Sequence, residues 1–168
     1  MAENASRGDM LSGARQKIVL ANPTITAGAY TANDALGGLM TFAGAAAFDG
    51  GSGMVVAVRL LIANPTPAAP GIDLHLFNRA VTPAADNAAA SFTVADLDDG
   101  AWCGFVPVRS NDWMSAAATN LVAAYKETRV PFHCASGSKD IFGAMVDVDG
   151  ATYGATDDLE VVLTVLQD

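Results

Sequence analysis

The sequence predicts an all-β domain, an antiparallel β-sandwich of the jelly-roll type with an extended N-terminal arm. Short apolar segments, several of them alternating with polar residues, recur at roughly the 8–12-residue spacing of sandwiches and barrels. Sixteen glycines and seven prolines are spread along the chain and indicate many turns. No long segment has the apolar periodicity of a helix.

The length favours one domain. A chain of 168 residues buries roughly 70% of its unfolded surface, which is enough to fold without cross-links. Residues 1–15 are small and polar with little periodicity, so we expect a flexible arm there. Residues 16–168 show no fixed-period repeat and no linker, and they are expected to form a single β-sandwich domain.

Residues 53–77 are expected to form the core hairpin of this domain. Residues 54–62 are rich in β-branched and large apolar side chains, which favours a strand. Residues 63–71 contain three prolines, which remove backbone donors and fix φ, so a wide loop is predicted. Residues 72–77 then alternate between apolar and polar side chains, as a half-buried strand does.

The segments on either side predict further short strands. The expected strands are residues 17–21, 24–30, 39–42, 91–94, 101–108, 129–134, 140–148 and 159–166. Residues 31–38 are expected to be a loop, and residues 120–127 fit one helical turn and a strand equally well. Pro107 indicates an edge strand or a bulge. Asp149-Gly150 is a favoured pair for a hairpin turn.

The charge argues against nucleic-acid binding. The net charge is −9 and the pI about 4.4, so phosphate backbones would be repelled. The nine basic residues are scattered from Arg7 to Lys139 and form no basic patch. No segment approaches the roughly 20 apolar residues that span a bilayer, and the N-terminus lacks a secretory signal.

The two cysteines are therefore expected to be free thiols in a protein made in the cytoplasm. Reducing conditions there disfavour disulfides, although Cys103 and Cys134 could pair if their strands are neighbours.

No catalytic, cofactor-binding or metal site is predicted. The glycine-rich residues 50–53 lack the following Lys-Ser/Thr of a phosphate loop, and no serine lies in a G-x-S-x-G frame. The soft metal ligands have no zinc-site spacing; they are His75, Cys103, His133 and Cys134. Asp147 to Gly150 lacks the further ligands of a calcium loop.

The two tryptophans allow two interpretations. Trp102 and Trp113 could mark a carbohydrate or partner surface, but tryptophan more often anchors a core.

Several segments resemble a family of virion structural proteins from tailed bacteriophages and prophages. The matching segments are residues 24–30, 50–53, 74–77, 130–132, 138–143 and 158–168. The resemblance covers residues 16–168 and consists of turns and strand ends. It implies a particle component, and in particular a capsid decoration (cement) protein on the capsid surface of the virion. Proteins of that role are often β-sandwiches that form trimers, and no functional residue carries over.

The first hypothesis is therefore a non-enzymatic homotrimer that binds and stabilises the lattice of the major capsid protein, without a cofactor. We expect the arm and the proline-rich loop to make the contacts. The candidate contact residues are Arg7, Met10, Leu11, Arg15, Pro65, Pro67 and Pro70. The alternatives are a tail, neck or fibre-associated protein, a carbohydrate-binding module, and a cupin-like enzyme with His75 and His133 as metal ligands.

Overall fold

A computed structural model describes residues 15–63, 69–97, 100–115, 121–156 and 159–168. Almost all regular structure in these residues is strand. The strands are β1 (Arg15–Ala21), β2 (Gly28–Ala29), β3 (Asp34–Phe42), β4 (Ser52–Ala63), β5 (Ile72–Phe77), β6 (Trp102–Val108), β7 (Trp113–Ser115), β8 (Leu121–His133), β9 (Ile141–Asp147), β10 (Thr152–Tyr153) and β11 (Leu159–Gln167). The helical elements are a single turn, α1 (Val94–Leu97), and a 3-10 turn, η1 (Ser110–Asp112).

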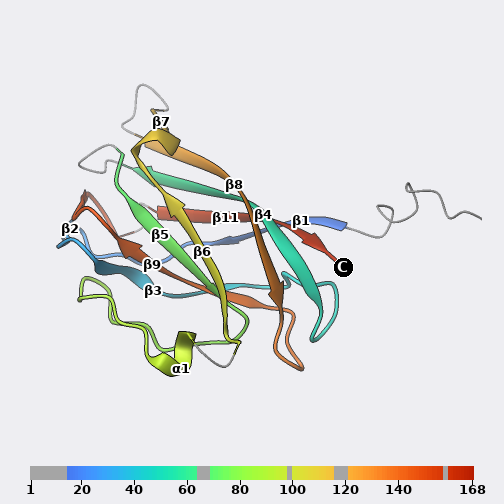
Figure 1. Cartoon of the computed structure of the whole chain (residues 1–168). Coiled ribbons are helices and arrows are strands. Elements are labelled where there is room, and N and C mark those ends of the chain that lie inside the picture. The colour runs from blue at the N-terminus through green and yellow to red at the C-terminus, as the bar shows by residue number, and fades with distance from the viewer. Residues whose placement is uncertain (1–14, 64–68, 98–99, 116–120, 157–158) are drawn as a thin grey trace, which may run out of the picture.

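The strands form two main antiparallel sheets that pack face to face (Figure 1). One sheet has the order β1-β11-β4-β8-β7, and the other has the order β3-β9-β5-β6. A small third sheet pairs β2 with β10 at one end of the sandwich. The predicted antiparallel β-sandwich is confirmed.

The pairing is nested along the chain. β5 pairs with β6, β4 with β8, β3 with β9 and β1 with β11, each pair antiparallel. This is the pattern of one long hairpin whose two arms remain paired from the tip to the ends. Two further ladders, β4 with β11 and β5 with β9, join these pairs into the two sheets. The result is the eight-stranded arrangement of a jelly roll.

The main core lies between the two sheets. On β5, the buried side chains that face it are Ile72, Leu74 and Leu76. On β11 the corresponding side chains are Leu159, Val161, Leu163 and Val165, as the alternation of the sequence predicted. Fully burying each such side chain stabilises the fold by about 1.5–3 kcal/mol.

A second, smaller cluster lies on the outer face of the four-stranded sheet. Its buried members are Phe77, Val81 and Ala144, with Leu39, Phe92 and Phe142 packed against them. Val81 and Phe92 come from the connection between β5 and β6, the segment that carries α1 in Figure 1. This connection therefore covers part of the outer face.

The predicted core hairpin is wrong in its pairing. β4 and β5 both form, but β4 belongs to the five-stranded sheet and β5 to the four-stranded sheet. The proline-rich connection between them therefore crosses from one layer to the other. Stacked sheets lie about 10 Å apart, so β4 and β5 cannot form the two arms of one hairpin.

Several local predictions also change. Residues 24–30 contain only the two-residue strand β2, residues 91–94 form no strand, and β3 begins at Asp34 within the predicted loop. The glycines that suggested that loop lie at an irregularity, because the register of β3 against β9 shifts between Leu36 and Met40. Residues 121–127 are strand, within β8.

The predictions made from Pro107 and from Asp149-Gly150 have different outcomes. Pro107 lies on β6, which is an edge strand, as expected. Asp149-Gly150 does not close a hairpin, because β10 pairs with β2 and not with β9.

The turn that follows β9 is organised by Asp147, whose side chain is fully buried. Its carboxylate accepts hydrogen bonds from the backbone N–H groups of Gly150 (2.6 Å) and Ala151 (3.1 Å) and from the hydroxyl of Tyr153 (2.8 Å). The ring of Tyr153 meets that of Tyr30 edge to face, with 5.3 Å between ring centroids. Tyr30 in turn donates to Asp86 at 2.8 Å.

We expect Asp147→Asn to lower the free energy of unfolding by about 2–4 kcal/mol, because an amide turns one acceptor into a donor opposite N–H groups. Tyr153→Phe removes a single hydrogen bond and should cost about 1–2 kcal/mol. Urea denaturation measures both. A loss for Asp147→Asn no larger than that for Tyr153→Phe would contradict the role given to the carboxylate.

Candidate binding surfaces

The outer face of the five-stranded sheet carries several exposed apolar side chains. The exposed apolar or aromatic side chains on its strands are Ile18, Leu20, Met54, Met114 and Tyr125. Ile18 is 64% exposed and Tyr125 is 54% exposed, so no described part of the chain covers them. Exposed apolar side chains gathered on one face of a sheet are typical of an interaction surface.

The ladders place Leu20 and Tyr125 in the same row across the sheet. Leu20 lies opposite Val162 on β11, which lies opposite Arg59 on β4, which lies opposite Tyr125 on β8. One residue-pair row of the sheet therefore runs from the edge strand β1 to β8. Their neighbours along each strand point into the core, since successive side chains alternate.

A bulge hollows this face. Val56 has no partner in either ladder, because Val55 and Ala57 pair with neighbouring strands on both sides and the register shifts between them. Bulges increase the local twist of a sheet. An open groove of about 740 Å³ lies here, and its lining includes Met54, Val56, Tyr125, Leu166, Glu127 and Arg129.

The charges on this face are balanced. Arg59 and Glu160 form an ion pair at 3.2 Å, and Glu127 and Arg129 both line the groove. Exposed pairs contribute little to stability. Their effect here is that the face is locally close to neutral, whereas the chain as a whole carries −9.

The predicted contact residues lie mostly outside the described residues. Arg7, Met10, Leu11, Pro65 and Pro67 are all outside them. Arg15 is exposed and begins β1, opposite Gln167, so the first strand starts within the predicted arm.

Pro70 differs from the expectation for a contact residue. It is buried, and its carbonyl oxygen accepts a 2.8 Å hydrogen bond from the indole Nε1–H of Trp113. Both residues therefore have a structural role beside β7, and the side chain of Pro70 offers little surface to a partner.

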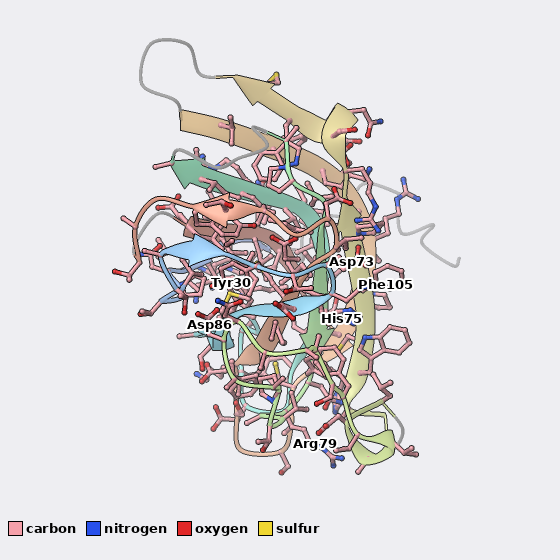
Figure 2. All side chains as sticks on the ribbon, turned by 90° about the vertical axis from the view of Figure 1, so that its left-hand side faces the viewer. Tyr30, Asp73, His75, Arg79, Asp86 and Phe105 are labelled. Atoms are coloured by element: carbon pink, nitrogen blue, oxygen red, sulfur yellow. The ribbon has the colours of Figure 1, made fainter. Side chains whose placement is uncertain are left out.

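A second candidate surface is an aromatic cluster on the outer face of the four-stranded sheet. His75 of β5 lies among three rings: Phe92 at 4.8 Å, Phe105 at 5.5 Å and Trp102 at 6.3 Å between centroids. Trp102 is 38% exposed and Phe105 is 44% exposed. Figure 2 shows Phe105 projecting outward beside His75.

Polar groups border this cluster. Asp73, two residues before His75 on β5, forms an ion pair with Arg109 at 2.7 Å. The Nδ1 atom of His75 is buried and has no hydrogen-bond partner. Burial lowers the pKa of His75, and the negative charge of Asp73 opposes this effect only in part.

The sequence singled out Trp102 and His75 separately but did not predict that they lie together. Of the two interpretations of Trp102, the exposed surface fits better than the core anchor, because the residue is 38% exposed. The signal that could have found the cluster is the placement of Asp73 and His75 on the polar face of β5. The strand that pairs with β5 could not be identified from sequence, so the partners of His75 could not be named.

The histidines do not support the cupin-like site. His75 lies on β5 in the four-stranded sheet, whereas His133 is exposed at the end of β8 in the five-stranded sheet. Within the described ranges, no group of three or more His, Cys, Asp and Glu side chains is close enough together to hold a metal ion.

Both cysteines are free thiols. Burial raises the pKa of Cys103 to about 11, so its thiol is protonated near neutral pH. Burial also raises the pKa of Cys134. The two free cysteines are as the sequence predicted.

Comparisons with known proteins add little. No family model and no curated protein matches the chain. Among solved structures, a structure of Triatoma virus aligns with this chain at 14% sequence identity and a TM-score of 0.13. The alignment covers 94% of this chain and 72% of the viral chain. A likeness this weak carries no argument about fold or function.

In the described part of the chain, no helix has the length and apolar character needed to cross a membrane.

The lowered pKa of His75 predicts a pH effect on stability. On acidification, the unfolded chain binds a proton at His75 first, near pH 6.5. The stability that the neutral form of His75 contributes to the folded state is therefore fully present above that pH. It is lost as the pH falls from about 6.5 towards the lower pKa of the folded state. We expect His75→Phe to weaken this dependence, measured as the urea midpoint at several values of pH.

His133→Gln is the matched control, because His133 is the other histidine of the chain and lies exposed at the end of β8. Equal losses of stability by His75→Phe and the parent protein between neutral and mildly acidic pH would show that His75 does not cause the pH dependence.

Proposed function

We propose that this protein is a non-enzymatic structural component of a virion, a capsid decoration protein that binds the lattice of the major capsid protein. The observation that carries the proposal is the apolar outer face of the five-stranded sheet, defined by Ile18, Leu20, Met54, Met114 and Tyr125. The resemblance to virion proteins of tailed phages supplies the identity of the partner.

The physical properties of this face suit docking on a protein surface. Apolar side chains from four strands lie on one rigid sheet, so few side chains lose freedom on binding. The balanced charges reduce repulsion from an acidic partner, although the whole chain carries −9. Aromatic residues such as Tyr125 are enriched among the residues that dominate binding energy.

Stabilisation would follow from mass action. A protein that binds the assembled lattice but not its separated subunits stabilises the lattice at every occupied position. A homotrimer would match three-fold positions of a capsid and would multiply the contacts of each protomer by avidity. Residues 1–16 supply an additional contact in this proposal.

We expect Tyr125→Ser to weaken binding to particles stripped of this protein by about tenfold or more, since it truncates an exposed ring on the docking face. Co-sedimentation with the particles measures the affinity. Phe48→Ser is the control, because Phe48 is equally exposed, at 57%, but lies outside the five-stranded sheet. Equal binding by the two variants would reject this face.

The copy number in purified particles tests the role itself. We expect a ratio to the major capsid protein near one or a simple fraction of one, because decoration proteins occupy the whole lattice. Quantitative mass spectrometry of particles from the phage or prophage that encodes the chain gives this ratio. A handful of copies would favour the tail, neck or fibre alternative, and absence from the particle would overturn the proposal.

A further inference from the structure

The opposite outer face, that of the four-stranded sheet, carries a pair of exposed aromatic rings. Trp102 and Phe105 both lie on β6, with ring centroids 6.3 Å apart and ring planes inclined by only 14°. Residues three apart in a regular strand point to opposite faces. A bulge removes this restriction, because Cys103 has no partner between Trp102, opposite Phe77, and Gly104, opposite Leu76.

Two neighbouring rings pack against this pair. His75 stacks on Phe105 with an interplanar angle of 19° and a centroid distance of 5.5 Å. Phe92 packs against His75 at 4.8 Å and against the buried Phe77 at 5.6 Å. A platform supported in this way loses little side-chain freedom when a ligand binds.

The size of the platform favours a small ligand. With 38% of Trp102 and 44% of Phe105 exposed, and about 200 Å² for each such side chain, the rings present on the order of 150–200 Å². A stable protein–protein interface buries about 800 Å² on each partner. Two rings of this area match the face of one or two sugar units.

The polar border and the charge narrow the ligand class. Asp73 lies opposite Pro107, two residues along β6 from Phe105, and forms an ion pair with Arg109. Both side chains can exchange hydrogen bonds with hydroxyl groups. The net charge of −9 disfavours polyanions, including nucleic acids, whose bases would otherwise stack on such rings. The ligand class that fits the rings, the polar groups and the net charge is a neutral molecule with one apolar face and several hydroxyl groups.

We propose that Trp102 and Phe105 form a binding platform for a neutral oligosaccharide. The C–H groups on one face of a pyranose carry partial positive charge and would lie against the negative faces of the two rings. Asp73 and Arg109 orient the sugar through its hydroxyl groups. The platform lies on the sheet opposite the proposed docking face, so it stays accessible when that face binds a lattice.

The test is titration with three probes: cellotetraose, maltotetraose and triacetylchitotriose. We expect at least one of them to bind with millimolar affinity or better, measured by calorimetry, and to shift the NMR signal of the Trp102 indole N–H. The indole of Trp113 should not shift, because it is half-buried and bonded to the carbonyl of Pro70.

Phe105→Ala and Trp102→Ala should each weaken this binding at least about tenfold, whereas Tyr125→Ala should not, because Tyr125 is a more exposed ring that lies on the other sheet. Thermal unfolding checks that each variant is folded.

Failure of all three sugars to bind at about 10 mM would overturn the proposal. Unchanged binding by a folded Phe105→Ala variant would also overturn it.

The two proposals fail separately. Tyr125→Ser should lose particle binding and keep sugar binding, and Phe105→Ala should do the reverse. Loss of particle binding by Phe105→Ala, with no sugar bound, would make the aromatic pair a protein contact and overturn the sugar site alone.

Discussion

The structure depends on the ladders that close the nested hairpin into a roll. β4 pairs with both β11 and β8, and β5 pairs with both β9 and β6. These two central strands fix which side of every strand meets the core. Because side chains alternate along a strand, a slip of one residue in β4 would move Val55 and Leu60 out of the core and Arg59 into it.

The closed roll leaves two outer faces with different surroundings. Described residues of the connection between β5 and β6 cover part of the four-stranded sheet and leave the pair of rings on β6 exposed. No described segment covers the five-stranded sheet in this way, so its apolar residues remain exposed. This asymmetry is why the two faces support different proposals, a broad docking surface and a small ligand platform.

Irregularities in the strands create both candidate surfaces. The extra residue Val56 hollows the five-stranded sheet, and the extra residue Cys103 brings Trp102 and Phe105 to one face. Neither bulge is visible in the sequence, because a bulge is defined by the register with a partner strand. By contrast, the buried Asp147 orders the turn after β9 through residues close to it in the chain.

The sequence by itself determined the fold class and the alternation that buries Leu159 to Val165, since these follow from local periodicity. It also limited the strand with Pro107 to an edge or a bulge, because proline has no N–H to donate. Only the tertiary structure decided that β4 and β5 lie in different sheets and that His75 meets Phe92, Trp102 and Phe105. Pairing between distant strands depends on which apolar faces can be buried together. That choice is made by the whole chain, and no single segment encodes it.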